Sequence, residues 1–193
     1  MYHELLREAS FWSFLYKIDK DVAEAARQAK CPCGGCLHCA HYPRNPRGGP
    51  EKLPKEWRYR LSFCCQRDGC RKRVTPPSVR FLGRKVFFGA VVILVSAMRQ
   101  GASPRRVREL SQMFGADRRT IARWQVFWKE LFPQTPFWKV NRGRLIAMAE
   151  ILVLPLSMLQ AFVRSGDDRV GWERLLRFLS PITTGRGPMS NVV

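Results

Sequence analysis

The spacing of hydrophobic residues predicts helices at the start of the chain and again in its second half. Between residues 2 and 29, apolar side chains recur three and four positions apart, as they do on one face of a helix: Leu5, Leu6, Phe11, Phe14, Leu15, Ile18, Val22 and Ala26. Asp19 or Asp21 is a candidate cap for a second, short helix that ends near Ala29. Residues 31–80 are interrupted by many prolines and glycines, which disfavour helices.

Within residues 31–80, two stretches favour strands. Residues 57–63 alternate large apolar side chains with basic or polar ones. Residues 71–75 are a candidate return strand, and the hairpin turn between the two would hold Cys65 and Cys70. The extended basic stretch 42–50 fits either an arm in a DNA minor groove or a plain loop of the hairpin.

After residue 80 the pattern is helical again. Residues 85–99 are apolar nearly all round, which predicts a buried helix. Ser103 and Pro104 are suited to the cap and first position of the next helix, and Asp117 to the cap of a third, which Pro133 and Pro136 end. Further helices are expected near residues 144–154, 155–164 and 170–179. The two longest apolar stretches, 86–98 and 145–163, are too short or too polar to span a membrane.

The charge of the chain changes which partners we expect. The formal net charge is +19 in 193 residues, of which 46% are hydrophobic. Residues 1–30 are neutral, whereas residues 31–85 carry thirteen basic and three acidic side chains. A positive excess in one region is typical of proteins that bind nucleic acid, with an anionic membrane surface as the second choice. We expect duplex DNA as the partner and no membrane contact.

Seven cysteines, clustered rather than dispersed, indicate a metal site. No signal-peptide pattern opens the chain, so we expect a cytoplasmic protein, located at the nucleoid, in which cysteines bind metal more often than they form disulfides. Two short thiol clusters beside glycines are what a structural Zn²⁺ ion requires. The predicted ligands are Cys31, Cys33, Cys65 and Cys70, with Cys36, His38 and Cys64 as substitutes.

Basic side chains near this site and on the helices after it are the predicted DNA contacts. If Ile121, Trp124 and Trp128 face the core, the opposite stripe of their helix carries arginines that could reach base edges in a major groove. Other basic residues would contact phosphates. The full predicted set is Arg71, Lys72, Arg73, Arg80, Arg84, Lys85, Arg105, Arg106, Arg118, Arg119 and Arg123.

These features together predict a mostly α protein with a small β zinc ribbon. The expected segments are an N-terminal helical segment (1–30), the zinc ribbon (31–80), a helix-turn-helix (81–135) and a C-terminal helical segment (136–193). No acidic trio, Ser/His/Asp set, P-loop or glycine-rich nucleotide motif is present in the sequence, so we expect no enzymatic activity. A nuclease remnant is the weaker alternative.

The order of motifs over residues 31–132 resembles the N-terminal zinc-ribbon plus helix-turn-helix region of insertion-sequence transposases and small proteins of bacterial mobile elements. The resemblance is carried by a cysteine turn at Cys31, a second one from Cys65 to Cys70 with basic residues and Thr75 after it, and the apolar helix that follows. It continues in the segments 103–104, 109–110, 114–116 and 120–124. It implies recognition of DNA by an accessory or regulatory factor of a mobile element. The alternative is an adaptor that binds a transposase or recombinase, or RNA, without reading DNA sequence.

Overall fold

The computed structural model describes residues 2–50, 52, 54–82, 87–99, 104–146, 153–163 and 167–184. The protein is mostly helical, at 60%, with a small antiparallel sheet region and a cysteine cluster. The helices are α1 (Tyr2–Leu5), α2 (Ala9–Gln28), α3 (Gly89–Arg99), α4 (Pro104–Phe114), α5 (Arg118–Val126), α6 (Phe132–Gln134), α7 (Pro136–Ile146), α8 (Leu156–Val163) and α9 (Asp168–Leu179). A π-helical stretch, η2 (Phe127–Leu131), joins α5 to α6, and the 3-10 helices are η1 (Lys55–Arg58) and η3 (Ser180–Thr183).

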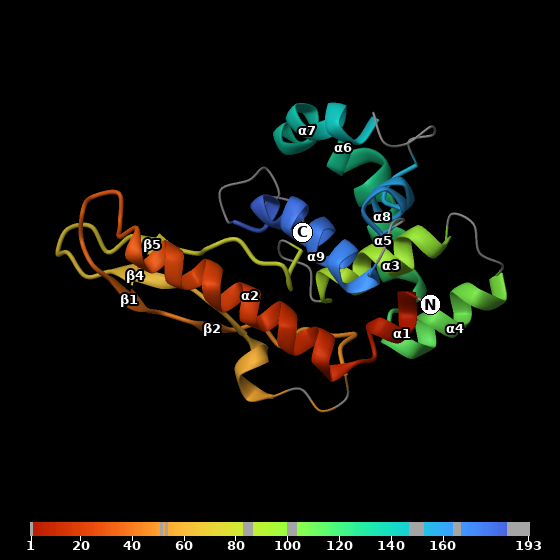
Figure 1. Cartoon of the computed structure of the whole chain (residues 1–193), viewed down its shortest axis with the longest axis horizontal. Helices are drawn as coiled ribbons and strands as arrows, with labels where there is room; N and C mark the ends of the chain where they lie inside the picture. Colours follow the sequence, from red (N-terminus) through yellow and green to blue (C-terminus); the bar gives the residue numbers. More distant parts are fainter. Residues whose placement is uncertain are drawn as a thin grey trace.

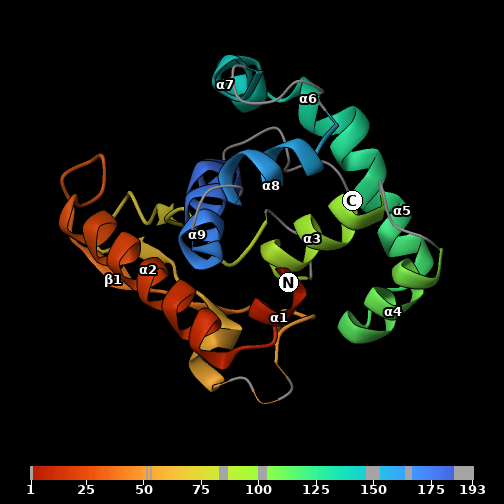
Figure 2. The ribbon, with the colours of Figure 1, turned by 45° about the vertical axis from the view of Figure 1, so that its right-hand side comes forward.

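The strands are short and all pair antiparallel. They are β1 (Leu37–Cys39), β2 (Tyr42–Pro43), β3 (Tyr59–Arg60), β4 (Phe63–Cys65) and β5 (Arg73–Val74). One sheet has the order β1-β4-β5, and β2 pairs with β3 in a second. Helix α2 lies along these strands, whereas α4 and α5 lie beyond α3 on the other side of the molecule (Figures 1 and 2).

The main core is formed by the helices and by the inner side of α2. Residues 90–95 of α3 are each at most 1% exposed, so the prediction of a helix buried on all sides is confirmed. Trp12 of α2 packs against Phe88, with ring centroids 4.3 Å apart. Helices α8 and α9 pack against each other and against α3. None of the helices within the described part of the chain combines the length and the hydropathy that crossing a bilayer requires.

Two helix boundaries differ from the sequence prediction. α2 runs without interruption to Gln28, so neither Asp19 nor Asp21 caps a second helix. The helix that begins at Arg118 continues through η2 and α6 to Gln134, between the two prolines expected to end it, whereas α7 begins at Pro136 and not near residue 144. In η2 the N–H of Phe132 donates to the carbonyl of Phe127, five residues back. This widened turn accommodates a proline, which has no N–H to donate.

The predicted strand over residues 57–63 is also wrong in part. Trp57 lies in η1, and the strand is divided into β3 and β4. The alternation predicted Tyr59 inside and Arg60 outside, whereas Tyr59 is 42% exposed and Arg60 is 3% exposed. Arg60 turns inward because its guanidinium donates to the carbonyl of Pro76 and lies over the ring of Phe81.

Candidate metal centre and basic surface

The first half of the metal centre is a tight turn directly after α2. Lys30, at φ +59°, redirects the chain at the end of the helix. The N–H of Gly34 then donates to the carbonyl of Cys31 at 2.7 Å, and the N–H of Cys31 donates to the carbonyl of Gly35 at 3.0 Å. These two bonds turn Cys31 and Cys33 toward the strands.

The second half is the hairpin between β4 and β5. Cys65 ends β4, and its N–H donates to the carbonyl of Lys72 at 3.0 Å. The N–H of Cys70 donates to the carbonyl of Arg67 at 3.1 Å, which closes the turn. A bond from the N–H of Gln66 to the carbonyl of Cys36 joins the hairpin to the first turn at 2.9 Å.

The two halves bring four thiols together, and they are the four that spacing selected. The Sγ atoms of Cys31, Cys33, Cys65 and Cys70 all lie within 4.8 Å of one another. The Cys33 and Cys65 sulfurs are 3.5 Å apart, and the Cys31 and Cys70 sulfurs are 3.8 Å apart. A Cβ atom at Gly35 would lie 2.6 Å from the Cys65 sulfur, so only glycine fits there. This group can hold a metal ion.

The substitute ligands lie outside this cluster. Cys36 and His38 are exposed. Cys64 is half-buried, and its sulfur contacts the carbonyl of Arg71 at 3.3 Å. Successive strand residues face opposite sides, so Cys64 points away from the side on which Cys65 meets the other three thiols.

The cluster perturbs the acidity of its thiols in opposite directions. The pKa of Cys33 is lowered to about 6, mainly because the backbone N–H of Gly35 donates to its sulfur and the neighbouring thiols add further hydrogen bonds. The pKa of Cys65 is raised to about 12, mainly because burial disfavours the thiolate. A cation bound among the four sulfurs would replace their protons, because metal ligation requires thiolates.

Basic residues beside the cluster differ in what they are free to contact. Arg71 and Lys72 are exposed, and Arg71 pairs with Asp68 at 2.7 Å. Arg73 donates to the carbonyl of Ala40 at 2.8 Å and lies over the ring of Tyr42, so part of its side chain is held by the sheet. All three remain candidate phosphate contacts.

Arg80 is not a DNA contact, and that prediction is wrong. Its side chain is 1% exposed, and its Nε donates to Asp19, also 1% exposed, at 2.7 Å. Its Nη1 donates to the carbonyl of Trp57 at 2.8 Å, and its guanidinium lies over the ring of Tyr16. The sequence held one signal of this site: Asp19 follows Leu15 by four positions and Ile18 by one, so it falls on the apolar face of α2.

The second basic region is the pair α4 and α5. Gly115, at φ +64°, and Ala116 form the turn between them. The prediction that Asp117 caps α5 is confirmed, because its carboxylate accepts the N–H of Thr120 at 2.8 Å and the hydroxyl of Thr120 at 3.0 Å. These bonds hold the pKa of Asp117 below its ordinary value. Both helices pack against α3.

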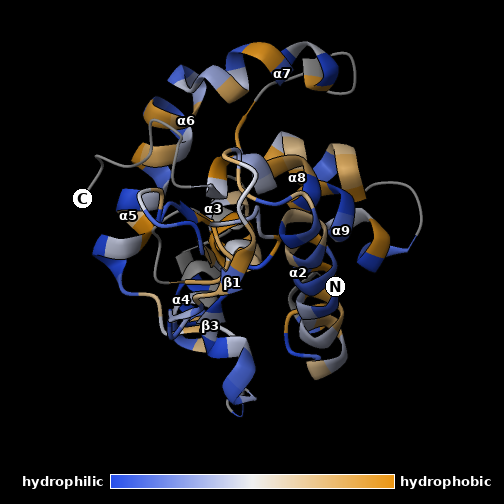
Figure 3. Ribbon diagram, turned by 90° about the vertical axis from the view of Figure 1, so that its left-hand side faces the viewer, coloured by the Kyte–Doolittle hydropathy of each residue, from blue (hydrophilic) through white to orange (hydrophobic). Residues whose placement is uncertain are grey.

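Helix α5 turns its apolar side inward and its arginines outward. Ile121 and Trp124 are buried, as predicted. The exposed stripe consists of Arg118, Arg119, Ala122 and Arg123. In Figure 3 the ribbon of α5 lies at the edge of the molecule and carries the hydrophilic colour at several positions. Nη2 of Arg123 donates to the hydroxyl of Thr120 at 3.1 Å, which turns this arginine toward the start of the helix.

The remaining predicted contacts divide into two groups. Arg105 is exposed on α4, where it pairs with Glu109 at 3.1 Å. Arg84 and Lys85, together with the side chain of Arg106, lie outside the described residues.

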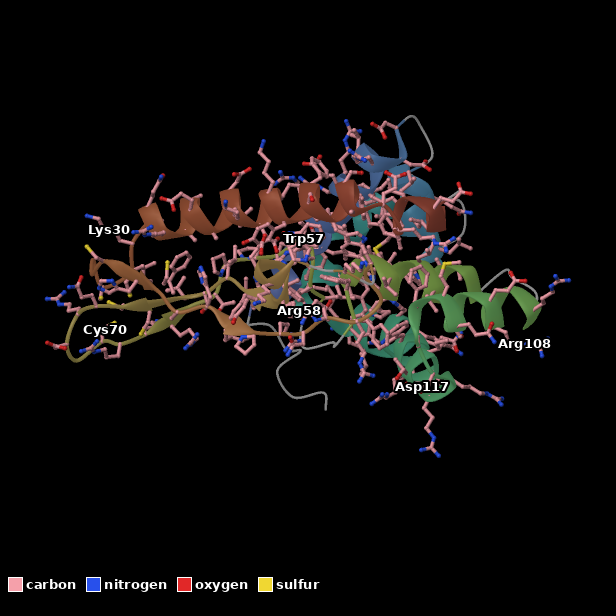
Figure 4. All side chains as sticks on the ribbon, turned by 90° about the horizontal axis from the view of Figure 1, so that it is seen from below. Lys30, Trp57, Arg58, Cys70, Arg108 and Asp117 are labelled. Carbon is pink, nitrogen blue, oxygen red and sulfur yellow. The ribbon has the colours of Figure 1, made fainter. Side chains whose placement is uncertain are left out.

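The metal centre and α5 lie far apart along the molecule. Figure 4 shows Lys30 and Cys70 at one end, and Arg108 and Asp117 toward the other.

Comparisons of the chain with protein-family models, with curated proteins and with solved structures gave no match.

Proposed function

We propose that this chain is a DNA-binding protein whose cysteine cluster holds one structural Zn²⁺ ion. Four sulfurs at the corners of a tetrahedron with Zn–S bonds of about 2.3 Å would be about 3.8 Å apart. The Cys33–Cys65 and Cys31–Cys70 sulfur pairs, at 3.5 and 3.8 Å, fit that arrangement. Four protein ligands leave no open position for a substrate, which favours a structural ion over a catalytic one.

The exposed arginine stripe on α5 is the observation that carries the DNA-binding proposal. Arg118, Arg119 and Arg123 project from a capped helix that follows α4 after a short turn, and both helices rest on α3. In a helix-turn-helix protein, the second helix of such a pair enters the major groove with its N-terminal residues on base edges. Arginine is suited to this role because its guanidinium matches the two acceptors of guanine.

The cellular role proposed is that of an accessory or regulatory factor of a mobile element. It rests on the resemblance of residues 31–132 to the N-terminal region of insertion-sequence transposases. In this proposal the zinc-bound hairpin presents Arg71 and Lys72 to phosphates, and α5 reads the groove. The net charge of +19 supports a polyanionic partner.

A salt titration of DNA affinity tests the proposal. A duplex of about 20 base pairs is titrated with the zinc-loaded protein at several salt concentrations, and the logarithm of the binding constant is plotted against that of the salt concentration. Each phosphate contact releases counterions, so a steep negative slope is expected. Undetectable or salt-insensitive binding would refute DNA binding. Recovery of a protein partner without nucleic acid from cells would favour the adaptor alternative.

A further inference from the structure

The structure points to a basic surface between the metal centre and α5, and this inference rests on the proposed DNA-binding function. We propose that one continuous DNA duplex lies along the chain from the cysteine cluster to α5, and that Arg47 and Arg58 contact its phosphates between these two regions. Neither arginine belongs to the metal centre or to α5.

The first link leads from the cysteine cluster to Arg58. Arg73, beside the cluster, donates to the carbonyl of Ala40, where β1 ends and the chain continues into β2. In β2, Tyr42 pairs with Arg60 and Pro43 with Tyr59 of β3. The N–H of Arg44 then donates to the carbonyl of Arg58 at 2.7 Å. The backbone of Arg58 is therefore held against the residue that follows β2.

The second link leads from Arg58 to α5. Arg47 forms a parallel bridge with Phe87, and the N–H of Phe88 donates to the carbonyl of Arg47 at 3.1 Å. The ring of Phe87 meets Trp124 of α5 edge to face, with centroids 5.0 Å apart. Residues 42–48 are thus held by backbone hydrogen bonds to Arg58 and Phe88, and they connect the strands to the segment that packs on α5.

The charges along this path are available to a ligand. Arg47 and Arg58 are exposed, and within the described part of the chain neither forms an ion pair. Figure 4 places Arg58 between Cys70 at one end and Asp117 toward the other. Glu56 is the exposed carboxylate nearest to Arg58 in the sequence of η1. On the outer side of α2, by contrast, Lys17 and Lys20 are followed by Asp21 and Glu24, so the charges of that face nearly cancel.

The length of the path decides which ligand can occupy it. Helix α2 has 20 residues and runs beside it, so the path is at least about 30 Å long at 1.5 Å per residue. A duplex rises about 3.4 Å per base pair, so about nine base pairs are needed to reach from one end to the other. A longer duplex can contact both ends and the two arginines between them at once.

The test compares Arg47→Gln/Arg58→Gln with the matched control Lys17→Gln/Lys20→Gln. Both double variants remove two positive charges, one pair from the proposed path and the other from the outer face of α2. Zinc content and circular dichroism establish that each variant is folded. Affinity for a duplex of about 20 base pairs is then measured over a range of salt concentrations by fluorescence anisotropy.

In the arginine variant we expect the negative slope of log K against log salt to become shallower by about 2, which is about 1 for each lost phosphate contact. The lysine variant should keep the wild-type slope. A hairpin with a stem of about six base pairs, too short to span the path, should bind with a shallower slope than the long duplex. Equal slopes for the two variants, with normal binding by the wild type, would overturn the inference and leave the proposed function intact. Failure of the wild type to bind would refute both. Tighter binding to an RNA duplex than to DNA would overturn the assignment of the ligand.

Discussion

The carboxylate of Asp19, in the middle of α2, accepts a hydrogen bond from Nε of Arg80 at 2.7 Å, and both side chains are 1% exposed. The same carboxylate accepts the hydroxyl of Ser78 at 2.6 Å and the N–H of Val79 at 2.7 Å. The N–H of Ser78 in turn donates to the hydroxyl of Thr183, near the other end of the described chain. Asp19 therefore fixes α2 to residues 78–80, and Ser78 in turn links this segment to the end of the helical core.

Removal of this carboxylate should destabilise the protein severely. In Asp19→Asn, the Arg80 guanidinium would remain buried without its counter-charge, which typically costs about 3–5 kcal/mol. Urea unfolding measures the effect. The matched control is Glu24→Gln, on the outside of the same helix, where the pair with Arg27 is about half exposed and should contribute less than about 1 kcal/mol. Equal losses in the two variants would contradict the role of the buried pair.

Zinc retention should depend on Cys65 and not on its neighbour Cys64. Cys65→Ser removes one of the four clustered sulfurs, so metal analysis should fall from about one zinc ion per chain to nearly none. Cys64→Ser removes a thiol that lies outside the cluster and should keep the metal. If both variants bind zinc as well as the wild type does, the four sulfurs are not the ligands.

Two arginines of α5 should govern sequence preference. Arg119→Ala/Arg123→Ala should reduce the affinity difference between a selected duplex and a scrambled one, because each guanidinium bound to a guanine contributes about 1–3 kcal/mol of discrimination. The control is Arg105→Ala/Arg108→Ala on α4, which should weaken both duplexes equally. Anisotropy titrations with the two duplexes distinguish these outcomes. An unchanged difference in the α5 variant would show that this helix does not read bases.

The cap of α5 should give the protein a measurable pH dependence. The folded-state pKa of Asp117 is held below its ordinary value, chiefly by the N–H of Thr120. Its contribution to stability is therefore complete above the ordinary pKa of aspartate and is lost as the pH falls through the lower folded-state value. Asp117→Ala should be less stable than the wild type at neutral pH, and the difference should shrink on acidification. Denaturant unfolding from pH 7 to about pH 3 checks this, and a constant difference would contradict it.

Features that depend on local sequence could be predicted. The apolar run that forms α3, the cap at Asp117 and the inward positions Ile121 and Trp124 all follow from helix periodicity and capping chemistry. The four clustered cysteines were also the predicted ligands, although their spacing left Cys36, His38 and Cys64 open as substitutes. The helical features are decided within a few residues, so the sequence carries the information for them.

Features that depend on distant partners could not be predicted in the same way. Arg80 looked like a surface charge because its partner is 61 positions away in α2. Arg60 faces inward because the carbonyl of Pro76 and the ring of Phe81 receive it, against the alternation of its own strand. In both, tertiary contacts outweigh the local preference.

Mutations at the metal centre should be harmful at Gly35 as well as at the four cysteines. Even the single methyl group of alanine at this position would overlap the Cys65 sulfur, so that sulfur or the turn would have to shift. A substitution at this glycine, which supplies no sulfur, would therefore disturb the cluster. A search for distant relatives of this chain should weight the glycine two residues after the second cysteine of the turn as heavily as the cysteines themselves.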